Sequence, residues 1–303
     1  MKVLVTGSAG RFGRAVVAAL AVAGQEVIGV DIVPDDSGLC AATLPADLTD
    51  AGEAFEVVSR HRPEAVVHLA AVATPFSRTD TLTYRVNTQA AFNICQAAVH
   101  GGVRRVVVAS SPTVIGYGAP DGSWRPRRLP VDEDHPVRPW NAYSLSKAAA
   151  EDTARSFAVA SGGRTSFAVL RPCFVVAPED WAGAPTQTGH TLLQRLDEPA
   201  LAGAALFNYL DARDGAEMVR LLLDALPELP PAEVFFAGAA DALARRPLAE
   251  LIPAVYPELA EAAAHLTGTA PAFSTAKAER LLGWRPLRSW RSELLEPSVA
   301  DPS

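Results

Sequence analysis

Cysteine is scarce in this chain, and its placement excludes two kinds of site. Cys40, Cys95 and Cys173 are the three cysteines among 303 residues, and they lie far apart. Their spacing matches neither a metal site nor a disulfide framework. We therefore expect no bound metal, and a reducing compartment such as the cytoplasm.

Long apolar runs and an excess of positive charge are also missing. The longest apolar stretch, Ala15–Ala23, is too short to span a bilayer. The segment Val3–Val5 runs into a glycine-rich loop without an export-type cleavage region. A formal net charge of −7 repels a phosphate backbone on average. We therefore expect that neither a membrane nor a nucleic acid is a partner.

Short β-branched segments alternate with longer helical patterns through about residue 170. Near-continuous apolar strands separated by helices are typical of a parallel sheet that is covered on both faces. We predict strands at Val3–Val5, Glu26–Val30, Ala65–Leu69, Val103–Ala109 and Ser166–Leu170, and helices at Arg11–Ala23, Asp50–Arg60, Leu82–His100 and Tyr143–Ala160.

The loop between the first strand and the first helix is rich in glycine. Gly7, Gly10 and Gly13 allow the backbone to turn tightly and approach a pyrophosphate, which the positive end of the helix favours. Asp31 ends the second strand, where a carboxylate accepts bonds from ribose hydroxyls and repels a 2′-phosphate. The pattern predicts a dinucleotide site that prefers NAD to NADP, although Arg11 could neutralise a phosphate nearby.

The pattern becomes less regular after Pro172. We predict helices at Thr191–Leu196, Ala212–Leu226, Leu248–Val255 and Thr275–Leu282, and strands at Ala205–Leu210 and Val234–Ala237. The predicted fold class is α/β, a Rossmann-type doubly wound parallel sheet with a small C-terminal mixed α/β substrate-binding region. Residues 1–172 would form the NAD-binding domain, with returning segments near 205–240. Residues 173–296 would mainly form a cap, and 297–303 a tail.

Two residues four positions apart, Tyr143 and Lys147, carry the strongest chemical signal. Four residues make about one helical turn, so both side chains project from the same helix face. A phenol loses its proton near pH 10, and a cation beside it lowers that pKa. Together with a dinucleotide loop, the pair predicts proton-coupled hydride transfer, with Tyr143 as the general acid and base.

At these residues the chain resembles the extended short-chain dehydrogenase/reductase superfamily, also called the NAD-dependent epimerase/dehydratase family. The resemblance covers nearly the whole chain. The matching pieces are Gly7–Gly13, Asp31, Ala46–Leu48, His68–Ala71, Asn87, Ala109–Ser111, Tyr143, Lys147 and Leu170–Pro172, with Leu210–Asp214 and Lys277–Trp284 nearer the end.

The resemblance implies a role for each matching residue. The cofactor would contact Gly7, Gly10, Arg11, Phe12, Gly13, Asp31, Asp47, Leu48, Leu69, Ala70, Ala71, Asn87, Ser110, Tyr143, Lys147 and Pro172. Within this set, Asp47 and Leu48 would border the adenine, and Asn87 would brace the neighbouring helix and strand. Ser111 would hydrogen-bond the reacting oxygen, whereas Ser110 would lie nearer the nicotinamide. Substrate contacts are expected at Ser111, Thr113 and Phe174.

Three departures from the family bear on the substrate. Pro112 and Thr113 replace the acid pair of the sugar dehydratases, which disfavours dehydration. Phe174 replaces an asparagine that is usual in sugar-nucleotide members. Ala205 occupies the place of an arginine that grips a nucleotide diphosphate, a group that usually needs a cationic clamp. These differences argue against a nucleotide sugar.

Three hypotheses remain for the function. The first is an NAD-dependent oxidoreductase that acts on a secondary alcohol or ketone of a small, sugar-like or biosynthetic molecule. The second is a sugar or nucleotide-sugar epimerase that retains NAD and returns the hydride to the opposite face. The third is a non-catalytic dinucleotide-binding module. The resemblance also implies a homodimer, formed through Leu82–His100 and Tyr143–Ala160.

Overall fold

A parallel sheet forms the centre of the molecule in the computed structural model, which describes residues 1–33 and 37–294. The strands are β1 (Lys2–Thr6), β2 (Glu26–Asp31), β3 (Ala42–Pro45), β4 (Ala65–His68), β5 (Arg105–Ala109), β6 (Ser166–Pro172) and β9 (Glu233–Ala237). Their order is β3-β2-β1-β4-β5-β6-β9, and every neighbouring pair is parallel. The predicted Rossmann-type fold is confirmed. The direction of strand order reverses between β1 and β4, which is where open sheets of this type bind ligands.

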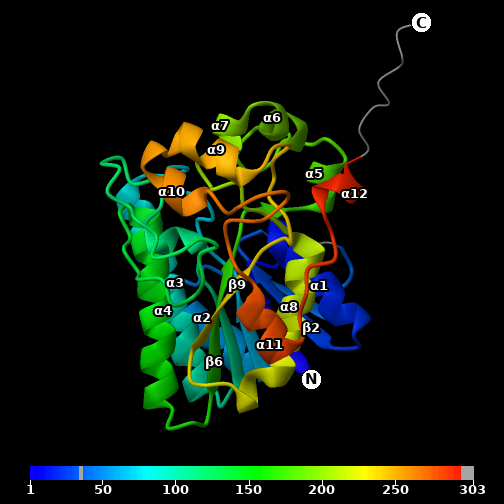
Figure 1. Cartoon of the computed structure of the whole chain (residues 1–303). Coiled ribbons are helices and arrows are strands. Elements are labelled where there is room, and N and C mark those ends of the chain that lie inside the picture. The colour runs from blue at the N-terminus through cyan, green and yellow to red at the C-terminus, as the bar shows by residue number, and fades with distance from the viewer. Residues whose placement is uncertain (34–36, 295–303) are drawn as a thin grey trace, which may run out of the picture.

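Helices cover both faces of the sheet, as the apolar strands require. Alternate residues of β1 enter different cores, Val3 and Val5 on one side and Leu4 on the other. On the first side lie α1 (Arg11–Val22), α8 (Ala212–Ala225) and α11 (Ala276–Leu282), and on the other α2 (Ala51–His61), α3 (Asp80–His100) and α4 (Ala142–Ala160), as Figure 1 shows.

A cap of short elements lies over the carboxyl ends of the strands. Its elements are β7 (Val175–Val176), α5 (Pro178–Trp181), α6 (Leu192–Asp197), α7 (Pro199–Gly203), β8 (Leu210–Asp211), α9 (Leu248–Val255), α10 (Ala260–Ala263) and α12 (Trp290–Glu293). Short 3₁₀ helices lie at η1 (Pro112–Ile115), η2 (Leu226–Glu228) and η3 (Pro257–Leu259). Figure 1 shows α6, α7, α9 and α10 gathered at this end.

The predicted strand at Ala205–Leu210 is wrong. Leu206 and Phe207 have φ angles of 51° and 57°, in the left-handed region, so the chain turns there instead of extending. Only Leu210 and Asp211 remain in a strand, β8, which pairs with β7. The segment Ala42–Pro45 is a strand that the sequence pattern did not reveal.

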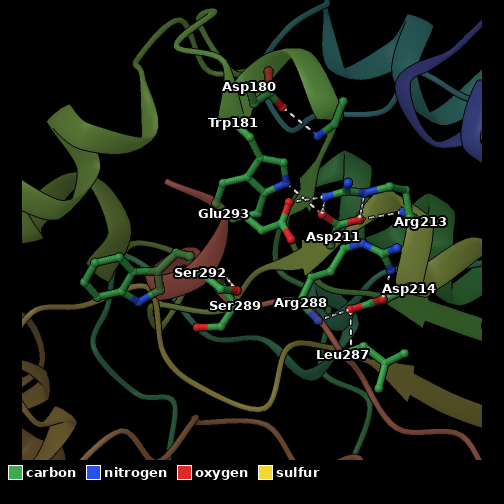
Figure 2. A network of polar contacts seen from close by, with 12 residues as sticks. Asp180, Trp181, Asp211, Arg213, Asp214, Leu287, Arg288, Ser289, Ser292 and Glu293 are labelled. Atoms are coloured by element: carbon green, nitrogen blue, oxygen red, sulfur yellow. Dashed lines mark hydrogen bonds and ion pairs between the residues drawn. The ribbon is translucent and has the colours of Figure 1, made fainter. Parts of the chain in front are cut away.

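Segments from the returning part of the chain contact both the sheet and the cap. β9 pairs with β6, and α8 packs against α1 on the sheet. Asp211, Arg213 and Asp214, at the start of α8, bind cap segments that lie before and after this helix in the chain (Figure 2). The contacts are Trp181 Nε1 to Asp211 (2.7 Å), Arg213 to Glu293 (2.6 Å), and the N–H groups of Leu287 and Arg288 to Asp214 (2.9 and 2.8 Å).

The division into domains stays a prediction. α11 lies within the range assigned to the cap, yet it packs against α8 and β9. The predicted tail, 297–303, falls outside the described residues. Within the described part of the chain, every helix is too short or too polar to pass through a bilayer.

Candidate active site

One cavity of about 1300 Å³ runs along the carboxyl ends of the strands. Its wall includes Gly7 after β1, Asp31 at the end of β2, Leu69 after β4, Ser110 after β5 and Pro172 at the end of β6. Single-ligand pockets usually measure about 300–1,000 Å³. The cavity therefore has room for a dinucleotide and a second molecule.

The glycine turn forms the first part of this wall and permits no side chain at two positions. A Cβ atom on Gly13 would lie 1.9 Å from the carbonyl oxygen of Gly7. A Cβ atom on Gly7, which has φ of +69°, would lie 2.7 Å from the nitrogen of Ala70. Gly10 is the N-cap of α1 and supplies no side-chain cap, so the first N–H groups of the helix are left for an acceptor in the cavity. Phe12 lines the same region.

Asp31 is held at the end of β2 by two backbone bonds. Its Oδ2 accepts from the N–H of Ala9 at 3.1 Å, and its Oδ1 accepts from the N–H of Val33 at 3.3 Å. Arg11 also lines the cavity, but its guanidinium pairs with buried Asp180 and donates to the carbonyl of Pro185 at 3.0 Å. The guanidinium of Arg11 is therefore engaged by cap residues. The carboxylate of Asp31 determines the charge at this end of the cavity. The turn and this carboxylate fit NAD.

The residues predicted to border the adenine, and those of the loop after β4, belong to the cavity wall. Asp47, Leu48, Leu69, Ala70 and Ala71 all line the cavity. The side chain of Asp47 accepts from the N–H of Thr49 at 2.9 Å, which closes the turn that carries it.

Asn87 acts through its neighbours and does not itself line the cavity. Its amide bonds both backbone groups of Val72, at 2.7 and 3.2 Å, and donates to the hydroxyl of Ser146 at 2.9 Å. Val72 belongs to the loop after β4, and Ser146 to α4. Asn87 therefore ties the cavity wall to the helix that carries Tyr143 and Lys147.

Tyr143 and Lys147 come from the first two turns of α4. Asn141 caps this helix in a reciprocal capping box with Ser144, which fixes where the helix begins. Both side chains are buried and line the cavity. The Nζ of Lys147 donates to the carbonyl of Ala109 at 3.0 Å and lies 5.9 Å from the centre of the Tyr143 ring. The predicted shared helix face is therefore present.

The pKa of Tyr143 differs from the expectation. Burial raises it to about 12, and only a hydrogen bond with Ser111 acts to lower it. Burial also lowers the pKa of Lys147 to about 8. In the ligand-free protein, desolvation therefore dominates, and the pKa of Tyr143 lies above its usual value instead of below it.

The two serines after β5 face different partners. Ser111 accepts from the N–H and the hydroxyl of Thr113, at 3.3 and 3.0 Å, and bonds Tyr143. Ser110 lines the cavity, but its hydroxyl donates to Glu151 at 2.6 Å. This arrangement brings Ser111, Thr113 and Tyr143 together and favours Ser111 over Ser110 as the serine that meets a reacting oxygen.

Sequence reasoning missed a buried ion pair behind this site. Arg171 donates from Nε and Nη2 to the two carboxylate oxygens of Glu151, at 2.7 and 2.9 Å, and both residues are 1% exposed. Glu151 lies one helical turn beyond Lys147, on the same face. That spacing is the one sequence signal that could have revealed it.

Sequence reasoning also missed the arginine on the cap side. Arg195 of α6 lines the cavity, and its guanidinium carbon lies 4.2 Å above the centre of the Phe174 ring. Ala205 lines the cavity too, as expected for a substrate-side residue. The absence of a cation at position 205 therefore does not leave the cap wall without one.

Comparisons with known proteins agree with this geometry. The family model described as "NAD dependent epimerase/dehydratase family" matches residues 3–238. The UDP-glucose 4-epimerase of Corynebacterium glutamicum is 29% identical over 94% of this chain and 91% of its own. That of Azospirillum brasilense is 34% identical over 61% of this chain, and there the chain spans only 52% of the relative. A short-chain dehydrogenase/reductase superfamily protein from Agrobacterium tumefaciens, solved with bound NAD, superposes with a TM-score of 0.72 at 25% identity, over 97% of this chain and 95% of that one.

Proposed function

Because the chain belongs to the NAD-dependent epimerase/dehydratase family, we propose that it is an epimerase that acts on a nucleotide sugar. It is an NAD-dependent enzyme of the short-chain dehydrogenase/reductase type. The epimerase hypothesis was second in order from the sequence, behind net oxidation or reduction. The relatives named UDP-glucose 4-epimerase now favour it, and UDP-glucose and UDP-galactose are the substrates to test first.

The observation that carries this proposal is a single cavity that joins the glycine turn, Tyr143 and the cap. Strand order supports this arrangement, because Asp31 ends β2 on one side of the switch and Ser110 follows β5 on the other. The adenosine end of the dinucleotide would therefore lie at Asp31 and the reacting end near Tyr143. The cap would close over a sugar at that second end.

We assign the cofactor contacts from this arrangement. The pyrophosphate would lie against Gly7, Gly10, Arg11, Phe12 and Gly13, the adenosine beside Asp31, Asp47 and Leu48, and the nicotinamide half beside Leu69, Ala70, Ala71, Ser110, Tyr143, Lys147 and Pro172. Asn87 would hold this wall in place. When bound, NAD accepts a hydride from the sugar carbon and returns it.

The chain's own residues would move the proton and position the sugar. Tyr143 would first have to be the phenolate, which would take the proton of the substrate hydroxyl and give it back to the carbonyl oxygen after the sugar has turned. Ser111 would hydrogen-bond the same oxygen, and Thr113 orients Ser111. Lys147, fixed by the Ala109 carbonyl, would supply the positive charge that favours the phenolate. Phe174 would border the substrate.

The experiment is an interconversion assay with the purified protein. We expect UDP-galactose to convert to UDP-glucose, and the reverse, without added NAD and without net formation of NADH. Stoichiometric NADH with a ketone or acid product would instead support the oxidoreductase, which Phe174 and Ala205 favour. Tight NAD binding without either reaction, across UDP-sugars, alcohols and uronic acids, would support a non-catalytic module.

We also propose that two copies associate through α3 and α4, and that the protein acts in the cytoplasm. Exposed apolar side chains on these two helices support the dimer: Tyr84, Phe92, Leu145 and Val159 are 41%, 45%, 48% and 78% exposed. Light scattering should give the mass of a dimer for the natural chain. A charge on this face, as in Leu145→Glu, should shift it toward a monomer.

A further inference from the structure

Arg195 is a buried cation in the cap wall of the cavity. It lies in α6, between Leu192 and Leu196, which pack into the cap core. The side chain is 3% exposed, and it lines the cavity that also holds the glycine turn. Helix α6 therefore presents a guanidinium to the interior of the site instead of to solvent.

The contacts of Arg195 hold its plane but do not neutralise its charge. Its Nη1 donates to the hydroxyl of Thr188 at 3.2 Å, and its guanidinium carbon lies 4.2 Å from the centre of the Phe174 ring. Its Nε is buried without a hydrogen-bond partner. Burial alone lowers the pKa of Arg195, to about 10, and no carboxylate acts on it. Among residues 1–33 and 37–294, Arg195 takes part in no ion pair.

A second buried arginine, Arg171, has the carboxylate partner that Arg195 lacks. Arg171 offers its Nε and Nη2 edge to Glu151, which accepts with both carboxylate oxygens. This paired edge is the part of a guanidinium that binds planar or tetrahedral oxyanions most strongly. In Arg195 the same edge has no acceptor at Nε, while the other nitrogen, Nη1, is held by Thr188.

We propose that Arg195 binds an oxyanion of the substrate, a phosphate or a carboxylate, through this unpaired edge, which a small shift of the side chain would bring to the ligand. A buried cation without a counter-charge is unfavourable in the free protein, so the missing acceptor has to come from a ligand. Phe174 and Thr188 hold the guanidinium at the wall of the cavity. Phe174 therefore stands where it serves a cation, which accounts for an aromatic residue at that position.

The inference rests on the proposed function, because it takes this cavity as the substrate site. It adds that the substrate is anionic and that α6 supplies the recognition. Two sources carry the required chemistry: the diphosphate of a nucleotide sugar and the carboxylate of a sugar acid. The proposed epimerase predicts the first.

The first test measures ligand binding to the NAD-loaded natural chain by titration calorimetry. UDP is compared with uridine, and D-glucuronate with D-glucose, so that each pair differs in the oxyanion. We expect about 10-fold or tighter binding of UDP than of uridine, because a charge-assisted, two-point contact is gained. A preference for glucuronate over glucose, without one for UDP over uridine, would identify a sugar acid as the source of the oxyanion. Equal affinities within both pairs would overturn the inference.

Variants then assign the preference to Arg195. Arg195→Met keeps the length of the side chain and should lose most of the preference for UDP, while Arg195→Lys should keep part of it. The matched control is Arg245→Met, because Arg245 also lies in the cap, above the Trp290 ring at 5.8 Å, but is paired with Asp197. A preference for UDP that survives in Arg195→Met would overturn the inference.

Melting temperature separates recognition from a merely structural role. Without UDP, Arg195→Met should melt no lower than the natural chain, since an unpaired buried charge is removed. A clear drop together with unchanged UDP affinity would make Arg195 structural. Binding of UDP needs no turnover, so a failed interconversion assay with an intact UDP preference would contradict the epimerase alone. Interconversion unaffected by Arg195→Met would contradict this inference alone.

Discussion

Arg171 at the end of β6 and Arg195 in α6 are both buried, yet the two regions treat the charge differently. In the sheet region, Glu151 neutralises Arg171, and Ser110 and Arg155 complete the network. In the cap region, the Nε of Arg195 is buried without an acceptor. A compensated charge stabilises the folded chain alone, whereas an uncompensated one is stabilised when a ligand arrives. The comparison sets a compensated charge behind the cavity against an uncompensated charge in the cavity wall.

The largest expected effect concerns the stability that the ion pair of Glu151 and Arg171 provides. Glu151→Gln leaves the buried guanidinium of Arg171 without a counter-charge and should lower the free energy of unfolding by about 3–5 kcal/mol. Urea unfolding monitored by circular dichroism measures this change. The control is Glu56→Gln on the surface of α2, where Glu56 pairs with Arg60 at 3.8 Å and is largely exposed; we expect less than about 1 kcal/mol there. If both variants lose equally little, the two buried arginines do not differ as described.

Tyr143→Phe tests the hydroxyl that would exchange a proton with the substrate, between the sheet region and the cap region. The variant keeps the ring and removes the proton that the reaction exchanges, so turnover should fall about 100-fold or more while NAD affinity stays nearly unchanged. Steady-state interconversion and a separate NAD titration measure the two effects. Tyr84→Phe, on exposed α3, serves as the control. Near-normal turnover in Tyr143→Phe would remove this hydroxyl from the mechanism.

The sheet region also contains a buried neutral histidine, which makes its stability depend on pH. His68 is bonded to Thr6 at 2.8 Å, and burial lowers its pKa to about 3. The unfolded chain binds this proton near pH 6.5, so the free energy of unfolding falls as pH drops below that value. Between pH 6.5 and 5 the loss from His68 is about 2 kcal/mol. Urea unfolding at both pH values should show a smaller loss in His68→Asn, and an identical loss would contradict the assignment.

The smallest effect concerns the choice of cofactor. Asp31→Ala should weaken NAD binding about 10-fold and relax the discrimination against NADP, because the ribose loses an acceptor and a 2′-phosphate loses a repelling charge. Asp31→Asn keeps the shape, so it isolates the charge and should mainly relax the discrimination. Titrations with NAD and NADP measure both. Unchanged cofactor preference in the two variants would refute the role of this carboxylate.

The same division between regions explains what the sequence could predict. The strands from β1 to β6 other than β3, the glycine turn and the Tyr143–Lys147 spacing follow from local periodicity and steric rules, which act within a few residues. β3 is four residues long and ends in Pro45, so it carries little pattern. The turn at Leu206 and Phe207 depends on left-handed residues other than glycine, which composition does not signal.

Charges and pKa values were the least predictable part. The pairing of Glu151 with Arg171 and the burial of Arg195 are created by tertiary packing between segments distant in the chain. The effect of Lys147 on Tyr143 was expected from spacing, but burial depends on the whole site and reverses the direction of the pKa change. The substrate argument based on position 205 considered a single position, and the sequence did not reveal that Arg195 lines the same cavity.

Isotope retention at the sugar carbon tests the central claim most directly. UDP-galactose deuterated at the epimerised carbon is converted in ordinary water by the NAD-loaded protein, and the product is analysed by mass spectrometry. We expect UDP-glucose with deuterium on the same carbon, because the hydride is removed and returned within one cavity. Deuterium lost to solvent, or found in free NADH beside an oxidised sugar, would contradict the proposed epimerisation.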